Sequence, residues 1–226
     1  MKRVLAMPSK SKTVHFVRHF QSTWNEAEDE HNLTRFDKGL QSDALLDAPL
    51  STYGKKQALT IQEKIQDLNA EVAITSPLSR AIETCLLTYG DQNVVASHLC
   101  REIGESLCDI GTLKEDLVKM YPTVDFSNVP PKVWWYVDEK LKGQLTDPIK
   151  CYEFVLNNGT CKLGETFKGS HFQERMERFH DFLQNRPESN IVVFAHSGFL
   201  RSFLEKYYGR PFEQYYPNGE ILTYSL

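Results

Sequence analysis

Short apolar runs alternate with longer amphipathic stretches along most of the chain. The short runs predict strands at about 13–17, 72–75, 93–96, 190–195 and 220–225. The amphipathic stretches predict helices at about 51–68, 76–89, 164–185 and 198–208. Strands that alternate with helices indicate an α/β protein. We therefore expect a three-layer α/β/α fold, with a largely parallel sheet and helices on both of its faces.

Capping residues indicate where two of these predicted helices begin and end. Ser51 or Thr52 suits the N-cap of the first helix, whose apolar face is Ala58, Ile61, Ile65 and Leu68. In the next helix, Ser76 suits the N-cap, Pro77 the first turn and Gly90 the C-terminal stop. Its expected buried stripe leaves Arg80 free at the N-terminal end, and consists of Leu78, Ile82, Cys85, Leu86 and Tyr89.

Two segments interrupt the alternation. Residues 26–48 are polar and predict an irregular excursion over one face. Residues from about 107 to 165 carry four prolines and Trp134-Trp135-Tyr136, which we interpret as a lobe inserted over the ligand pocket and anchored by its aromatic residues. The long helix that follows has a core face of Phe172, Met176, Phe179 and Leu183, and its charges at Lys168, Arg175 and Arg178 are expected to face solvent. We expect one domain over residues 1–226.

Composition restricts the class of protein. The chain of 226 residues is 41% hydrophobic and carries a formal net charge of −4, which argues against broad binding to nucleic acid or to anionic membranes. No apolar run approaches the roughly 20 residues of a membrane span, and the apolar stretch near the N-terminus is too short for a signal peptide. The five cysteines are odd in number and lack C-x-x-C spacing, so we expect neither disulfides nor zinc. A cytoplasmic protein is expected; its oligomeric state cannot be inferred.

The chemistry gathers at three strand ends. Arg18-His19 follows the first strand, Arg80 begins the helix after the second, and His196 follows the strand at 190–195. Ligands of open α/β sheets bind at the carboxyl ends of the strands. Two histidines and two arginines brought to one edge would form a cationic pocket, and phosphate is the ligand that such a pocket suits.

Four sequence blocks resemble the histidine phosphatase superfamily, also called phosphoglycerate mutase-like proteins. They are Arg18-His19 with Asn25, Leu50-Ser51-x-x-Gly54-x-x-Gln57-Ala58, Ser76-x-Leu78-x-Arg80-Ala81-x-x-Thr84, and His196-Ser197-Gly198. Details near 46–50 and 101–127 are similar to the eukaryotic phosphoglycerate mutase-like branch. The resemblance implies the phosphoglycerate mutase-like fold and a metal-independent, cofactor-free phosphatase that acts on small phosphate monoesters or phosphoproteins.

The resemblance also implies a role for each matching residue. His19 is the expected nucleophile, with a ring proton held by a backbone carbonyl, and His196 is expected to assist it at the phosphoryl group. Arg18, Arg80 and Asn25 are expected to bind phosphoryl oxygens. The plainer alternatives are a structural core histidine, arginines in ion pairs, and Asn25 as a helix cap. Glu102 is the expected general acid and base, because it fits the acidic position of the family after the third strand. Glu105 is the rival candidate, because the register of this segment is ambiguous by three residues.

Two positions depart from the family pattern. Phe20 and Ser197 stand where glycines follow the two histidines, and Phe20 is expected to narrow the pocket mouth or stack on a substrate. A catalytically weak phospholigand-binding or scaffold protein is therefore an alternative. A phosphoglycerate-type mutase is another, although the substrate segment of the mutases is missing. The remaining histidines, among them His15 and His98, are expected to pack or hydrogen-bond locally.

Overall fold

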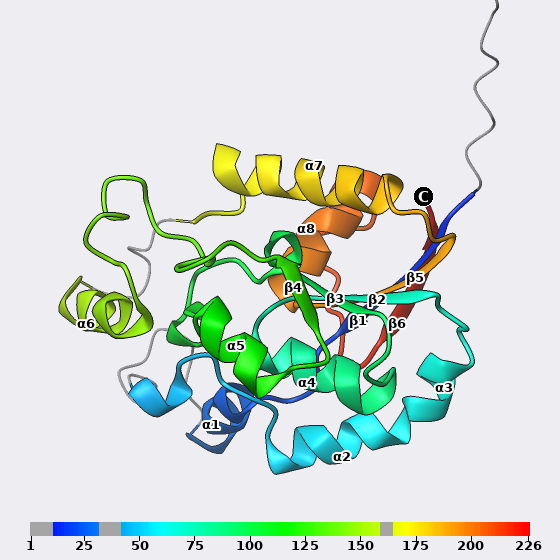
Figure 1. Cartoon of the computed structure of the whole chain (residues 1–226), viewed down its shortest axis with the longest axis horizontal. Coiled ribbons are helices and arrows are strands. Elements are labelled where there is room, and N and C mark those ends of the chain that lie inside the picture. The colour runs from blue at the N-terminus through cyan, green and yellow to red at the C-terminus, as the bar shows by residue number, and fades with distance from the viewer. Residues whose placement is uncertain (1–10, 32–41, 159–164) are drawn as a thin grey trace, which may run out of the picture.

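The protein folds around one six-stranded sheet (Figure 1). The computed structural model describes residues 11–31, 42–158 and 165–226. The sheet order is β4-β3-β2-β5-β1-β6, formed by Asp125–Asn128, Val94–Ser97, Val72–Thr75, Asn190–Ala195, Thr13–Arg18 and Ile221–Ser225. All neighbouring strands pair in parallel except β6, which runs antiparallel to β1 at the edge. The predicted mostly parallel α/β fold is confirmed.

Side chains that alternate along the strands build two cores. Val14 and Phe16 of β1 face one side of the sheet, whereas Val17 faces the other. The first side is covered by α7 (Ser170–Gln184) and α8 (Ser197–Tyr208), and the predicted core face of α7 is buried there. The opposite side is covered by α2 (Thr52–Thr60), α3 (Gln62–Gln66), α4 (Ser79–Thr88) and α5 (Lys114–Met120) (Figure 1). The result is the three-layer arrangement expected from the strand pattern.

The helix after β2 begins later than its capping signals predict. Ser76 accepts a hydrogen bond from the Leu78 amide at 3.3 Å, but α4 starts at Ser79 with Leu78 as its N-cap, so the prediction of Ser76 as N-cap is wrong. Asp47 provides the capping contacts from a distant loop, accepting from both the amide and the hydroxyl of Ser79. A tertiary contact therefore replaces the local cap.

The predicted first helix is divided in two. Ser51 caps α2, as expected, by accepting a hydrogen bond from the Gly54 amide. The helix is interrupted at Ile61, and α3 begins after it. A Cβ on Gly54 would lie 2.0 Å from the carbonyl oxygen of Gln21. This glycine therefore lets the start of α2 pack directly against the segment that follows His19.

The two interrupting segments contain more regular structure than their composition suggests. Helix α1 (Thr23–His31) occupies the start of the excursion predicted at 26–48, and the short 3₁₀ helix η2 (Asp43–Leu45) lies near its end. Residues 1–10 and 32–41 lie outside the described residues. The 107–165 region contains η4 (Leu107–Asp109), α5, β4 and α6 (Pro148–Asn158). Because β4 pairs with β3, part of this region belongs to the main sheet. Trp134 and Trp135 are buried in the core on the α4 side.

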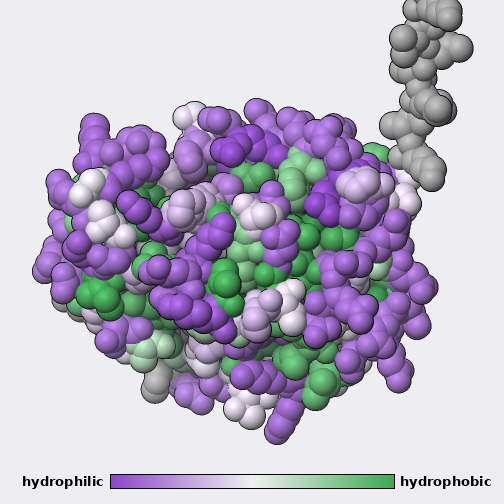
Figure 2. All heavy atoms as spheres, viewed as in Figure 1, coloured by the Kyte–Doolittle hydropathy of each residue, from purple (hydrophilic) through white to green (hydrophobic). Residues whose placement is uncertain are grey.

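Hydrophilic residues cover most of the face shown in Figure 2, and hydrophobic ones show through in its middle, below α7. Within the described ranges, no helix combines the length and the apolar character that crossing a bilayer requires.

Candidate active site

The carboxyl ends of β1, β2 and β5 bring the predicted residues together at one edge of the sheet. Parallel register places Arg18 beside Ala195 and Thr75 beside Phe194, so the segments that leave these strands are neighbours. A cavity of about 70 Å³ lies there. Its lining includes the side chains of Arg18, His19, Asn25, Arg80, Glu102 and Ser197. Such a small polar cavity suits a phosphoryl group better than a large ligand.

His19 is buried and held by its own segment. Its Nδ1 lies 2.6 Å from the Phe20 carbonyl oxygen, so Nδ1 donates and Nε2 carries the lone pair. Burial, followed by the nearby charges of Arg80 and Arg18, holds the pKa of His19 well below its ordinary 6.5. The imidazole is therefore neutral at physiological pH, which is the form a nucleophile needs.

His196 lies directly beside His19. The two ring centroids are 5.0 Å apart, and His196 is fully buried. Within the described part of the chain, neither ring nitrogen of His196 has a hydrogen-bond partner. Buried polar atoms are rarely left unpaired in proteins, and such exceptions occur at functional sites that complete their bonds with a ligand. Burial and the neighbouring cations, Arg80 first among them, hold the pKa of His196 well below 6.5.

Arg80 is not free at the start of α4, contrary to expectation. It is 3% exposed, and its guanidinium donates to the Cys108 carbonyl oxygen at 2.7 Å and to the Asp109 carboxylate at 2.8 Å. Asp109 also accepts from the Ser106 amide, which closes a capping box around η4. Arg80 therefore both forms an ion pair and lines the cavity, and the ion pair with Asp109 fixes its position there.

Arg18 approaches the cavity from β1. Its Nη1 donates to the Tyr216 carbonyl oxygen at 2.8 Å, and its guanidinium lies 5.3 Å from the centre of the Tyr215 ring. Its buried Nε has no hydrogen-bond partner among the described residues. Unlike Arg80, Arg18 forms no ion pair within those residues.

Asn25 has its predicted capping contacts and also lines the cavity. Its Oδ1 accepts from the amide and the hydroxyl of Ser22, at 3.2 and 3.0 Å, which stabilises the start of α1. Its Nδ2 points to Glu28 at 3.4 Å, and both side chains line the cavity. The capping role is observed, and a contact from Nδ2 to a phosphoryl oxygen stays a prediction.

Glu102, and not Glu105, lines the cavity. Its carboxylate accepts from three backbone amides: Ile103 at 3.0 Å, Gly198 at 3.0 Å and Phe199 at 2.8 Å. It therefore lies at the N-terminus of α8, where the helix dipole favours a negative charge. A Cβ on Gly198 would lie 2.7 Å from Glu102 Oε1, so the glycine in the His196 block leaves room for this carboxylate.

Neither departure from the glycine pattern blocks the cavity. Phe20 is buried with Leu50 and Ala58 in a small separate cluster and does not line the cavity. The expectation that Phe20 narrows the pocket mouth or stacks on a substrate is therefore wrong. Its φ is not positive, so glycine is not needed at this position. Ser197 begins α8 and lines the cavity.

Sequence reasoning missed a buried ion cluster behind Glu102. Glu165 binds Arg101 through two contacts, at 2.6 and 3.0 Å, and also binds Arg175 and the Gly104 amide. Arg175 donates in turn to the carbonyl oxygens of Leu99 and Arg101. The expectation that Arg175 faces solvent is wrong, because its side chain is buried and paired with Glu165, which lies ten residues earlier, before the start of α7. No local signal identified Glu165 as its partner. The cluster fixes the segment that carries Glu102.

The remaining histidines in the described residues form local contacts. His15 Nδ1 and Nε2 contact Thr223 and Asn190, His98 contacts the Asn128 carbonyl oxygen, and His180 stacks on Tyr207. Cys85 is a core residue, as expected. No group of three or more potential metal-ligating His, Cys, Asp or Glu side chains comes together in residues 11–31, 42–158 and 165–226.

Comparison with known proteins identifies the class. A sequence profile of the histidine phosphatase superfamily (branch 1) matches residues 14–122. A probable phosphatase of Schizosaccharomyces pombe is 29% identical over 133 residues, which cover 54% of this chain and 56% of that protein. A phosphoglycerate mutase-like protein of Arabidopsis thaliana is 23% identical, over 84% of this chain and 70% of that protein.

The fold agrees with solved structures of this class. A putative α-ribazole-5′-phosphate phosphatase of Escherichia coli superimposes with a TM-score of 0.55 at 17% identity, covering 95% of this chain and 90% of the other. At that identity the likeness concerns the fold alone. The sequence profile assigns residues 14–122 to the histidine phosphatase superfamily, and the shared fold agrees with that assignment. The chain spans little more than half the length of the yeast relative.

Proposed function

We propose that the protein is a phosphatase that hydrolyses phosphate monoesters through a phosphohistidine on His19. Superfamily membership, with relatives named as phosphatases and phosphoglycerate mutases, supports phosphatase or mutase activity. The observation that carries the finer proposal is the 2.6 Å contact between His19 Nδ1 and the Phe20 carbonyl oxygen. It fixes the tautomer that leaves Nε2 unprotonated, in a cavity lined by two arginines and by the carboxyl groups of Glu28, Glu102 and Asp109.

In the first step Nε2 of His19 attacks phosphorus and the P–O bond to the alcohol breaks. Arg18 and Arg80 bind the equatorial oxygens, and His196 donates a hydrogen bond to the same group. Glu102, protonated, gives its proton to the leaving alkoxide.

In the second step water attacks the phosphohistidine. Glu102, now a carboxylate, removes a proton from the water as the P–N bond breaks, and inorganic phosphate leaves. His19 returns to its neutral form and Glu102 to its protonated form. One carboxyl group thus serves both half-reactions, and neither of the two proposed steps uses a metal ion.

Hydrolysis of p-nitrophenyl phosphate in excess chelator tests the proposal. We expect turnover by the wild-type protein and a radiolabelled, acid-labile phosphoenzyme after rapid quenching. His19→Ala should lose both, whereas His180→Ala, a histidine on α7 outside the cavity, should keep both. Turnover without a His19-dependent phosphoenzyme would overturn the mechanism, and no turnover by folded protein would overturn the activity.

The leaving group tests the role of Glu102. Glu102→Gln should slow hydrolysis of alkyl phosphates far more than of p-nitrophenyl phosphate, because a basic alkoxide depends most on protonation. Glu105→Gln is the matched control, since Glu105 does not line the cavity. If only Glu105→Gln shows the leaving-group dependence, the assignment is wrong by three residues.

Binding and turnover assays also distinguish the two alternative functions, a scaffold protein and a phosphoglycerate-type mutase. A scaffold protein would bind vanadate without turnover, but Phe20, the residue that suggested it, faces away from the cavity. A mutase would interconvert phosphoglycerates with a bisphosphate primer. Entamoeba histolytica phosphoserine phosphatase shares the fold, with a TM-score of 0.51 over 93% of this chain. We therefore include phosphoserine in a panel of phosphorylated metabolites and phosphoproteins, which would identify the substrate.

A further inference from the structure

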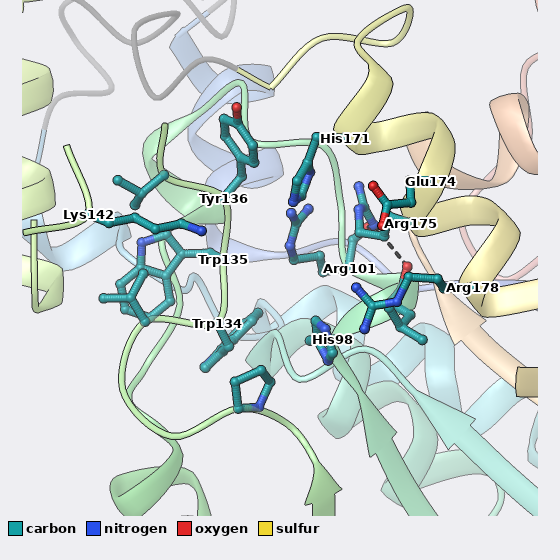
Figure 3. Close-up of a pocket in the computed structure, with 14 residues that line it drawn as sticks. His98, Arg101, Trp134, Trp135, Tyr136, Lys142, His171, Glu174, Arg175 and Arg178 are labelled. Carbon is teal, nitrogen blue, oxygen red and sulfur yellow. Dashed lines mark hydrogen bonds between the residues drawn. The ribbon is translucent and has the colours of Figure 1, made fainter. Parts of the chain in front are cut away.

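A second cavity, of about 270 Å³, lies between the 130–142 segment and α7 (Figure 3). It shares no lining residue with the cavity of His19 among the described residues. The nearest link between them is the Arg101–Glu102 peptide, with Arg101 lining one cavity and Glu102 the other. Its volume falls just below the range of drug-sized sites, about 300–1,000 Å³, and suits a ligand of one ring.

One wall of this cavity is aromatic and fixed. Trp134 and Trp135 are largely buried, with ring centroids 5.5 Å apart, and Trp134 Nε1 donates to the Thr112 carbonyl oxygen at 2.8 Å. Tyr136 continues the wall and meets the ring of His171 edge-on at 4.6 Å. Figure 3 shows these three aromatic side chains opposite the arginines. A rigid aromatic wall favours a planar apolar group.

The opposite wall is cationic. Arg101 and Arg175 are buried and form ion pairs with Glu165. Arg178 is exposed and forms no ion pair with a described carboxylate. Arg101 Nε is buried and has no hydrogen-bond partner among those residues. Lys142 is paired with Glu139. The remaining charges at this wall are three arginines against Glu165 and Glu174, which leaves one positive charge in excess.

We propose that this second cavity binds a small aromatic carboxylate. The planar ring would lie against Trp134 and Trp135, and the carboxylate would receive the fork of N–H donors from Arg178. One negative charge matches the single excess positive charge. A phosphate dianion matches it less well and has the separate cavity of His19. The proposal concerns binding alone and stands whether or not His19 is a nucleophile.

Calorimetry with benzoate tests the proposal. The full chain is first saturated with orthovanadate, which mimics a phosphoryl group and fills the cavity of His19. Benzoate should then bind with a stoichiometry of one, and benzamide and cyclohexanecarboxylate should each bind at least about fivefold more weakly, because one lacks the charge and the other the planar ring. In an NMR titration, benzoate should shift the indole N–H signals of Trp134 and Trp135 but not that of Trp24, which lines the other cavity.

Variants locate the site. Arg178→Ala should weaken benzoate binding by about tenfold or more, because it removes a charged hydrogen-bond donor. Lys168→Ala is the matched control: it removes a cation near α7 that does not line this cavity, and affinity should stay within about twofold. Both variants should keep the hydrolytic activity of the wild type. Absence of benzoate binding, its loss with vanadate, or equal affinity in Arg178→Ala and wild type would each overturn the proposal.

Discussion

Two buried arginine–carboxylate groups contact the segment that carries Glu102, and they are built differently. In the cavity of His19, Asp109 faces one arginine, Arg80, at 2.8 Å. In the cluster behind it, Glu165 faces two, Arg101 and Arg175. Burial raises the pKa of Asp109 to about 6, with the charge of Glu102 adding to the shift against the attraction of Arg80. Burial also raises the pKa of Glu165, but its two arginines lower it by more, to well below its ordinary 4.5.

The difference separates a structural anion from one that an incoming ligand can displace. Glu165 stays ionised at any physiological pH and holds two charges that would otherwise be buried without a partner. With a pKa of about 6, Asp109 would compete for the same guanidinium with a phosphoryl group bound at the proposed site. We infer that the first group maintains the fold around Glu102, whereas the second tunes the affinity of the cavity for anions.

The largest expected effect is on stability, from Glu165→Gln. This change leaves Arg101 and Arg175 buried without a compensating charge, which costs about 3–5 kcal/mol of unfolding free energy. Denaturant unfolding of wild type and variant measures it. The control is Glu177→Gln, which breaks an exposed pair with Lys206 and should cost less than about 1 kcal/mol. A loss below 1 kcal/mol in Glu165→Gln would show that the cluster does not hold the fold.

A smaller effect comes from His98, which lies near the arginines of this cluster and should make the free energy of unfolding depend on pH. Burial lowers the pKa of His98 to about 4, with the nearby arginines adding to the shift. Between pH 6.5 and about 4 the unfolded chain therefore binds a proton that the folded chain does not, so stability falls as pH falls through this window. His98→Gln should remove on the order of 2 kcal/mol of the stability lost between pH 7 and 5.

Unfolding curves at both pH values, for wild type and His98→Gln, provide the measurement. Comparing each protein with itself at pH 7 removes the constant cost of the lost contact to the Asn128 carbonyl oxygen. The same pH dependence in both proteins would mean that His98 is protonated in the folded state at pH 5.

The smallest expected effect is on anion affinity, from Asp109→Asn. Neutralising Asp109 removes a competitor for Arg80 while keeping an oxygen that can accept its hydrogen bond, so sulfate should bind about fivefold more tightly at pH 7. In a Glu102→Gln background, sulfate affinity should rise as pH falls through about 6 when Asp109 is present, and this step should vanish in Asp109→Asn. Calorimetric titration with sulfate measures both. An unchanged step in the variant would assign the titration to another group.

Local patterns determined much of this protein. Apolar runs located five of the six strands, the spacing of Phe172, Met176, Phe179 and Leu183 predicted the buried face of α7, and the motif order placed His19, Arg80 and His196 at strand ends that meet. These features depend on residues a few positions apart, or on the general rule that parallel strands present their carboxyl ends at one edge.

Only the tertiary structure placed Glu102, rather than Glu105, at the cavity of His19, because three residues of register in an irregular segment carry no periodic signal. The same holds for Arg175, which occupies a polar position on its helix and yet is buried, and for Glu165, whose partner Arg101 lies 64 residues away. Phe20 stands next to His19, the proposed nucleophile, but packs in a separate cluster. Ion pairs and side-chain direction depend on what the fold brings near, and distance along the chain does not encode it.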